Sequence, residues 1–217
     1  MKKIQITLLG MLMVITSFGQ YDPEALAVLD AMSAKYKSFS AFKATFNQKL
    51  TNKQAGLDET RTGSIIVKGS KYGLVINEFQ AFNNGKIITT FNEDLMEVNL
   101  SNYEPSEESI SVNNVYDIYK EGYKYNLMTT NQNGDRVVEL DPEDKSLPVF
   151  KLRMIIDAKD ELKSFIVFER DGNQYTYTIS DFEETTVADN YFDYFEGKFD
   201  TYKQSDSDVI DVVDFTY

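Results

Sequence analysis

The feature that most constrains this chain is a change of hydrophobic period within residues 23–50. Asp22 is a good N-cap, Pro23 suits the first helical position, and apolar side chains then recur at helical spacing as far as Tyr36. From Phe42 onward the apolar residues alternate instead, which is the period of a strand with one buried face. A helix that leads into such a strand needs a sheet to pack against, so the rest of the chain must supply one.

Short alternating segments separated by turn signals fill most of the remaining sequence. Asn83-Asn84-Gly85-Lys86 is a tight-turn sequence, because Asn-Gly supports positive φ at both central positions. Residues 51–62 are polar and are interpreted as a loop or hairpin end. Residues 101–119 are interpreted as a polar, acidic loop followed by a short helix lying on the sheet. The predicted strands cover residues 63–68, 72–79, 87–91, 95–100, 123–128, 136–140, 150–156, 162–169 and 174–182, with an edge strand at 209–215.

This pattern predicts an α+β fold that is mainly β. A strongly curved antiparallel sheet would form an incomplete β-barrel, with helices covering its open side. A full barrel without helices inside is the alternative architecture. The chain has 217 residues and no compositional break, so residues 20–217 are predicted to form a single domain.

Residues 1–19 are predicted to be a signal peptide. Lys2 and Lys3 form a positively charged start, a mostly apolar run follows, and small residues end at Gly19. A membrane anchor is the alternative, but the apolar run is short for a spanning helix of about 20 residues. We expect export to the periplasm with cleavage near Gly19–Gln20.

Composition excludes several classes of function. The chain has neither His nor Cys, which removes the commonest metal ligand, the usual general base and thiol chemistry. Its net charge is −13, and it becomes −15 once Lys2 and Lys3 leave with the signal peptide. So acidic a protein is repelled by phosphate backbones, and no nucleic-acid partner is expected.

Acidic clusters offer the nearest approach to a catalytic or metal site. Asp181, Glu183 and Glu184 could serve a hydrolase, but adjacency in sequence says little about a carboxylate pair in space, and a solvated strand end is the favoured interpretation. A second acidic series lacks the central Gly and terminal Glu of an EF-hand; it comprises Asp206, Asp208, Asp211 and Asp214. We therefore predict no catalytic residue, no metal site and no cofactor.

The remaining signal is a broad set of apolar residues at alternating strand positions, predicted to share one inner face. Such alternation fits an ordinary filled core as well as a cavity, and a filled core is the simpler interpretation. Met is adaptable enough to line a lipid site, yet it is equally common in cores. The set comprises Phe42, Phe46, Leu50, Ile66, Leu74, Ile76, Ile88, Met96, Val98, Leu152, Met154 and Ile156.

Several short motifs follow one another in an order that characterises one known family. The segment Ser40–Gln48 carries the pattern F-x-A-x-F-x-Q just after the first helix. The others are Thr62–Lys68, Asn84-Gly85-Lys86, Val138–Pro142, Phe199-Asp200 and Val209-Ile210-Asp211. In this joint order they resemble the outer-membrane lipoprotein carrier family, LolA.

The resemblance implies an incomplete β-barrel closed by helices, working as a monomer in the periplasm and not as an enzyme. It would take acylated lipoproteins from an inner-membrane lipoprotein-releasing transporter and pass them to an outer-membrane acceptor. The twelve inner-face residues would then bind acyl chains. A lipid- or peptide-sensing regulatory module on the same fold is the alternative function, and a hydrolytic enzyme is the third.

The sequence departs from the family at one position linked to release of cargo. The family often has Lys-Arg-Pro where this chain has Lys68-Gly69-Ser70, and that Arg is associated with holding the cover against the sheet. Gly69 cannot do so. Lys68 and Lys71 are therefore the candidates for gating.

Overall fold

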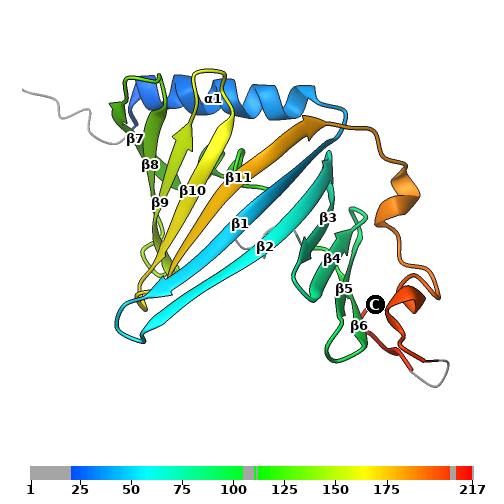
Figure 1. Ribbon diagram of the computed structural model, residues 1–217. Helices are drawn as coiled ribbons and strands as arrows, with labels where there is room; N and C mark the ends of the chain where they lie inside the picture. Colours follow the sequence, from blue (N-terminus) through cyan, green and yellow to red (C-terminus); the bar gives the residue numbers. More distant parts are fainter. Residues whose placement is uncertain (1–20, 105–109, 111, 206–208, 217) are drawn as a thin grey trace, which may run out of the picture.

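The computed structural model describes residues 21–104, 110, 112–205 and 209–216 (Figure 1). The predicted signal peptide, with its cleavage site near Gly19–Gln20, lies outside these residues. Within them, no helix is both long enough and apolar enough to cross a membrane.

The helix and strand predicted at the start of the chain are confirmed. Helix α1 spans Pro23–Ser38, and strand β1 spans Phe42–Asn52. The Asp22 carboxylate caps the helix by accepting the backbone N–H of Glu24 at 2.8 Å. It also accepts the N–H of Leu127 at 2.9 Å, so the cap fixes the start of α1 to the sheet.

Twelve strands in the described residues form one sheet. After β1 their bounds are β2 Leu57–Lys68, β3 Lys71–Ile76, β4 Phe79–Asn83, β5 Ile87–Asn92, β6 Glu97–Asn102, β7 Tyr123–Thr130, β8 Arg136–Pro142, β9 Val149–Ile156, β10 Leu162–Glu169, β11 Gln174–Glu184 and β12 Asp211–Asp214. Short 3-10 helices are η2 Ile118–Lys120, η3 Asp189–Phe192 and η4 Asp200–Tyr202.

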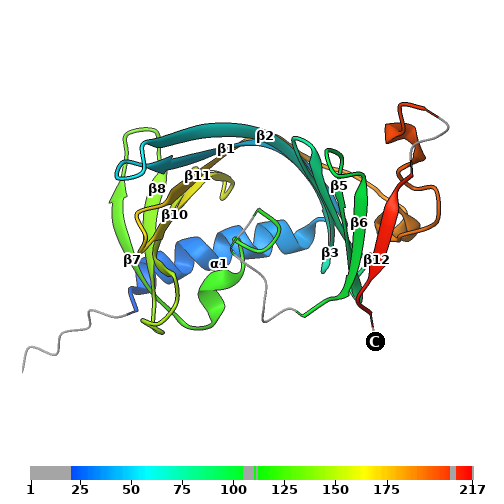
Figure 2. The ribbon, with the colours of Figure 1, turned by 90° about the horizontal axis from the view of Figure 1, so that it is seen from below.

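The sheet is an open, strongly curved arc. Its spatial order is β12-β6-β5-β4-β3-β2-β1-β11-β10-β9-β8-β7, and neighbours are antiparallel except that β12 runs parallel to β6. Strands β7 and β12 form the two edges, and α1 lies inside the arc (Figure 2). The predicted incomplete barrel is confirmed, and the full barrel without helices inside is excluded.

Three local predictions were wrong at least in part. The interpretation of residues 51–62 as a hairpin end is confirmed, because β1 and β2 form an antiparallel hairpin, but the loop interpretation is wrong for residues 57–62, which belong to β2. Their side chains are exposed on both faces, so no alternation marked them as strand. The predicted strand 72–79 is two strands joined at Asn77, which has φ 48° and so provides the left-handed residue of a tight turn. The helix predicted near Val115 is only the 3-10 turn η2.

The main core lies between α1 and the concave face of the sheet. Leu29 and Met32 of α1 are fully buried there, together with Phe46 of β1 and Phe165 of β10. The segment after β6, from residue 112 to 120, adds Val112, Val115, Tyr116 and Tyr119 to the same core. We call residues 112–120 the strap. Helix α1 and the strap therefore cover the concave face together.

A second, smaller core lies on the convex face of β4–β6. Phe82, Phe91 and Val98 point outward there and are covered by the chain between η3 and η4. The ring of Phe199 stacks on Phe91 with centroids 4.4 Å apart, and the Lys198 ammonium lies 3.9 Å from the centroid of Phe82. In Figure 2 this C-terminal segment lies outside the arc, beside β6.

Gly63 of β2 marks the closest packing in the main core. It pairs with Phe46, whose ring lies over it: a Cβ at Gly63 would overlap Phe46 Cζ and come 2.8 Å from the carbonyl oxygen of Val75. Only a glycine fits beneath that ring without a shift of the backbone.

We therefore expect Gly63→Ala to lower the free energy of unfolding by about 1–3 kcal/mol, because the added methyl group overpacks the core. Urea titration followed by far-ultraviolet circular dichroism measures the loss. In a Phe46→Leu background the ring is absent and only the Val75 carbonyl still crowds the methyl group, so the added cost of Gly63→Ala should be smaller. An unchanged unfolding midpoint in the single variant would contradict the packing described.

Candidate functional site

Nine of the twelve apolar residues predicted to share an inner face do lie on the concave face. Strand register places them there, because directly paired residues point to the same side of a sheet. Phe46 pairs with Gly63, which pairs with Ile76, and Met154 pairs with Phe165. The nine are Phe42, Phe46, Leu50, Leu74, Ile76, Ile88, Leu152, Met154 and Ile156.

The inner-face prediction was wrong for Ile66, Met96 and Val98. Ile66 pairs with Lys43 and therefore points outward with it. Val98 points into the convex core, and Met96, at the turn before β6, packs against that same core. Alternation reveals two faces but does not say which one is concave, and here a later segment buries the convex one.

The concave face beneath α1 is filled by the protein's own side chains. Leu152, Met154 and Ile156 have no exposed surface. One void below α1 and the strap, lined by Tyr36, Ile65 and Val115 among others, measures about 10 Å³, no more than a single water molecule needs. An acyl chain can enter this half of the arc only if part of the cover moves.

The concave face of β3–β5 is less covered. Leu74, Ile76 and Ile88 are only partly buried, and Phe79 keeps 41% of its surface exposed. By register these four side chains share one side of three adjacent strands. We call them the open wall. It is an apolar surface inside the arc that keeps part of its area exposed, although Leu74 and Ile76 pack against the edge of the main core.

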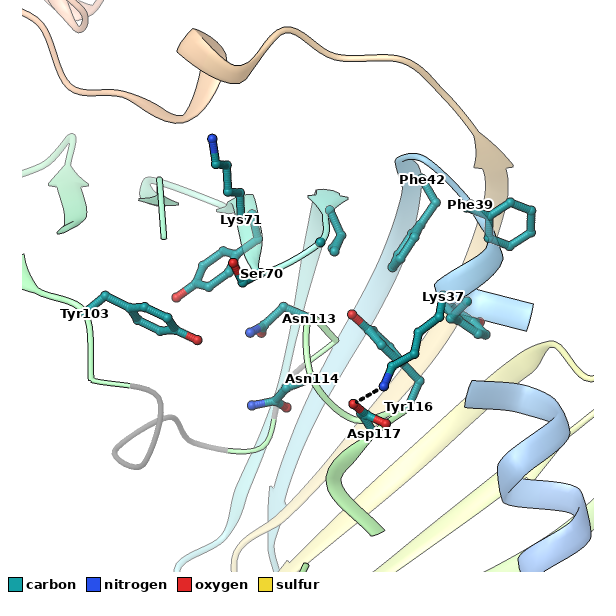
Figure 3. A pocket seen from close by; sticks show the side chains of 14 residues that line it. Lys37, Phe39, Phe42, Ser70, Lys71, Tyr103, Asn113, Asn114, Tyr116 and Asp117 are labelled. Atoms are coloured by element: carbon teal, nitrogen blue, oxygen red, sulfur yellow. Dashed lines mark ion pairs between the residues drawn. The ribbon is translucent and has the colours of Figure 1, made fainter. Parts of the chain in front are cut away.

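A pocket of about 360 Å³ (Figure 3) lies at the start of β3, the strand that carries Leu74 and Ile76 of this wall. It lies between the end of α1, the turn joining β2 and β3, Tyr103 and the strap. We call it the hairpin pocket. Its lining combines aromatic and apolar side chains with amide, hydroxyl and charged groups: Tyr36, Lys37, Phe39, Phe42, Val67, Gly69, Ser70, Lys71, Tyr72, Tyr103, Asn113, Asn114, Tyr116 and Asp117.

Asp117 joins the strap to α1. Its carboxylate pairs with Lys37 at 2.7 Å, accepts the hydroxyl of Ser33 at 3.0 Å and also pairs with Lys120. Burial by itself would raise the pKa of Asp117, but the hydrogen bonds from Lys120, Lys37 and Ser33 outweigh it and lower that pKa. The carboxylate is therefore charged across the neutral range.

A second polar contact supports the same junction. The Tyr119 hydroxyl donates to the Asp30 carboxylate at 2.6 Å. Burial and this hydrogen bond raise the pKa of Tyr119 to about 12, so the phenol keeps its proton and remains a donor. Two strap residues, Asp117 and Tyr119, thus hold the cover together.

The gating candidates Lys68 and Lys71 contact the C-terminal segment. Lys68 pairs with Asp189 at 2.8 Å and donates to the carbonyl oxygen of Val187 at 2.8 Å. Lys71 lies 3.6 Å from the same carboxylate. The hydrogen bond from Lys68, and then the charges of both lysines, lower the pKa of Asp189. These contacts hold the chain after β11 against the β2–β3 turn.

The carboxylates considered for hydrolysis, Asp181, Glu183 and Glu184, are not among the residues that line the pocket. Asp181 accepts the Thr45 hydroxyl at 2.8 Å, and Glu183 pairs with Lys43 at 2.6 Å; both carboxylates are exposed. In the described residues, no group of three acidic side chains is arranged to hold a metal ion. Of the acidic series at 206–214, residues 206–208 lie outside the described part.

The hairpin pocket could not be recognised from the sequence. Its walls come from four separate segments, and its polar residues are types common in any loop. Tyr72 offered the one local signal, because it alternates with Leu74 and Ile76 at the end of an apolar strand.

Comparison with known proteins gives one family match. The profile described as "Outer membrane lipoprotein carrier protein LolA" matches residues 37–195. No curated protein matches the chain at a significant level.

Solved structures with similar folds have low sequence identity. An uncharacterized conserved protein from Thermus thermophilus is 9% identical, with a TM-score of 0.55, over 88% of this chain and 99% of that one. The lipoprotein LppX of Mycobacterium tuberculosis is 14% identical, with a TM-score of 0.47, over 76% of this chain and 98% of that one. A LolA superfamily protein from Nitrosomonas europaea is 13% identical, with a TM-score of 0.46, over 78% and 97% of the two chains. At 9% identity the Thermus structure shows the fold alone.

We expect Asp117→Asn to loosen the strap, because it removes the charge that Lys37 and Lys120 share. Binding of the dye ANS at pH 7 should rise as apolar surface opens, and the free energy of unfolding should fall by about 1–2 kcal/mol. Glu183→Gln is the matched control, since it breaks an exposed pair with Lys43 away from the strap. Equal ANS binding in both variants would argue against a latch at Asp117.

The stability difference between the wild-type protein and Asp117→Asn should depend on pH. Because the folded protein holds the pKa of Asp117 below its ordinary value of 3.8, the contribution is complete above about pH 5 and is lost as the pH falls through the folded pKa. Urea titrations of both proteins between pH 7 and pH 3 measure this. A difference that stayed constant down to pH 3 would exclude the carboxylate as its source.

Proposed function

The chain belongs to the LolA family of outer membrane lipoprotein carriers, and from that premise we propose that it is a periplasmic chaperone for lipoproteins. It would bind their acyl chains and carry them from the inner to the outer membrane. The family description is that of a carrier and not of an enzyme. The observation that supports the proposal most directly is the open wall, an apolar surface inside the arc that keeps part of its area exposed beside the cover.

The proposal includes the predicted organisation of the chain. Residues 1–19 would be the signal peptide that directs export, and residues 20–217 would be the single carrier domain, working as a monomer. An inner-membrane lipoprotein-releasing transporter would supply the cargo, and an outer-membrane acceptor would receive it.

The free energy of transfer explains why such a carrier is needed. Burial of one CH₂ group stabilises by about 0.8 kcal/mol, so a chain of roughly sixteen carbons gains about 12–13 kcal/mol on leaving water. An acylated protein does not cross an aqueous compartment unaided at that cost. The carrier must also bind less tightly than a bilayer, and a wall that is only partly enclosed meets this condition.

The strap is the part of the cover that moves most easily in this proposal. Helix α1 is fixed by its fully buried Leu29 and Met32, by the Asp22 cap and by the ion pair of Lys35 with Glu161 at 2.7 Å. The strap buries apolar side chains in the main core and stacks Tyr116 on Tyr36 of α1, but its polar contacts with α1 come from partly exposed groups, which contribute little individually. Cargo entering along the open wall would displace the strap before it displaced α1.

Lys68 and Lys71 have a defined place in this proposal. Both contact Asp189, so they would act on the C-terminal segment beside the hairpin pocket. A gating role would therefore pass through that segment, in place of the direct hold on the cover that the family's Arg provides.

We expect Ile76→Glu to weaken binding of a synthetic triacylated lipopeptide by more than about tenfold, because acyl chains would lie against a carboxylate. Val75→Glu is the matched control: it adds the same charge at the adjacent position, on the convex face of β3. Isothermal titration calorimetry measures both, and circular dichroism checks that both variants are folded. Equal affinities would contradict acyl binding at the open wall. Met154 is unsuitable for this test because it is fully buried in the main core.

A transfer assay separates transport from sensing. The protein is loaded with fluorescent lipopeptide and mixed with acceptor vesicles, then the two are separated by flotation. Delivery of the lipopeptide to the vesicles is the outcome expected of a carrier. Retention of the lipopeptide on the protein would contradict transport and favour the sensing module.

A further inference from the structure

The two edges of the sheet differ in what occupies them. At the β7 edge, the N–H of Asp22 donates to the carbonyl oxygen of Tyr125 at 3.2 Å, and the Asp22 carboxylate accepts the N–H of Leu127 at 2.9 Å. The residues just before α1 therefore occupy backbone groups of β7. At the other end of the arc β12 pairs with β6, and no strand within the described residues pairs with its outer side (Figure 2).

The register of β12 shows which of its backbone groups point outward. The N–H groups of Asp211 and Phe215 donate, at 2.9 and 2.8 Å, to carbonyl oxygens of the turn before β6 and of β6 itself. Backbone groups of successive residues in a strand point in opposite directions, so the N–H and C=O of Val212 and Asp214 point away from β6. In the described part of the chain no backbone partner faces them. We call this side of β12 the free edge, and it offers two donors and two acceptors to a strand from another chain.

A pocket of about 280 Å³ lies against the free edge. Its apolar walls are Val98 and Val212, which pair across β6 and β12 and so share the convex side, together with Phe199 and Ile210. We call it the edge pocket. Small-molecule sites have volumes of about 300–1,000 Å³, so this pocket has room for one side chain of a docked strand.

The polar groups of the edge pocket are unevenly occupied. Lys203 pairs with Asp200 at 2.8 Å, and the Lys198 ammonium donates to two backbone carbonyl oxygens of the same segment. No hydrogen bond or ion pair between described residues engages the Glu196 carboxylate or the Tyr194 hydroxyl. The groups that remain available to a ligand are therefore a carboxylate and a phenol.

Negative charge surrounds Val212. Glu196, Asp211 and Asp214 are exposed, and within the described residues none of their carboxylates forms an ion pair. The Asp214 carboxylate accepts the hydroxyl and the N–H of Thr216 at 2.7 and 2.8 Å, and these hydrogen bonds lower the pKa of Asp214. A strand that carries Lys or Arg complements these charges, whereas an acidic strand is repelled.

We propose that a basic, strand-forming segment of another protein docks on the free edge of β12 and extends the sheet. Its backbone would bond to Val212 and Asp214, and one apolar side chain would enter the edge pocket. Lys or Arg side chains before and after that residue would lie beside Asp211 and Asp214. In such strand addition the main-chain bonds supply affinity, and the pocket and charges supply specificity. This interaction goes beyond the proposed carrier function and does not depend on it.

The test uses fluorescein-labelled peptides with the core Lys-Val-Val-Lys, which presents the same pattern in either strand direction. Fluorescence anisotropy with the full protein measures their binding. We expect a peptide with the core Glu-Val-Val-Glu to bind at least tenfold more weakly, because its carboxylates would face those of β12. A Lys-Thr-Thr-Lys core keeps the shape and the strand propensity, and its loss of about threefold or more would report the apolar side chain in the edge pocket.

A modified peptide tests the backbone bonds without altering the protein. In a Lys-Val-Val-Lys core with both Val nitrogens methylated, at least one lost N–H is the one that faces β12, because adjacent N–H groups point to opposite sides. We expect this peptide to bind about fivefold more weakly or worse. Adventitious attraction between opposite charges would not respond to the methylation.

A pair of protein variants tests the place of binding. The double variant Asp211→Asn, Asp214→Asn should weaken the Lys-Val-Val-Lys peptide about fivefold or more. The matched control Asp58→Asn, Glu59→Gln removes the same net charge from exposed positions on β2 and should leave the affinity unchanged. Circular dichroism checks that both proteins are folded.

The alternative outcomes are distinct. Equal binding of the Lys and Glu peptides, no effect of N-methylation, or equal losses in the two double variants would each overturn docking of a basic strand at β12. Absence of measurable binding of the Lys-Val-Val-Lys peptide would overturn it as well. Sedimentation of the unliganded protein as a dimer that the peptide does not dissociate would assign the free edge to a second copy and exclude this partner.

Discussion

One curved sheet with apolar side chains on both faces needs two covers, and this requirement organises the whole structure. Helix α1 and the strap bury the concave face, while the chain between η3 and η4 buries the convex face of β4–β6. After β11 the chain has to travel to the outside of the arc to complete that second core. Because the C-terminal segment is used there, the concave side of β3–β5 is left as the open wall. The candidate site therefore depends on which segments of the chain cover which face of the sheet.

Much of the fold could be predicted from periodicity and turn chemistry. The helix beginning at Pro23, the strand after it and the open, curved sheet all follow from local patterns whose period is unambiguous. The failures have local causes too. Residues 57–62 form a strand with no buried face, held by pairing alone, and the turn at Asn77 carries no glycine. In both places pairing with neighbouring strands decides the structure. The hydrophobic pattern of the segment itself does not predict that pairing.

The candidate site was less predictable, because its geometry depends on contacts between distant segments. Nine of the twelve apolar residues share the concave face. The alternation of apolar side chains along a strand could not show, however, that Val98 belongs to a second core on the other face. Nor could it separate Met154, which is sealed within the core, from Ile76, which is only partly covered. The strap contacts made by Asp117 and Tyr119 join residues more than eighty positions apart. The sequence shows which side chains can form ion pairs and hydrogen bonds. It does not show which of them lie close enough to do so.

The position of β12 at one edge of the sheet has a consequence for pairing between copies of the chain. An arc that does not close leaves two rows of backbone donors and acceptors at its ends, which other chains could extend by strand addition. Strand β12 is four residues long and carries a carboxylate at each end, Asp211 and Asp214, both exposed. Two such edges meeting would bring like charges together. The exposed carboxylates of β12 therefore disfavour extension of the sheet by pairing of one β12 edge with another.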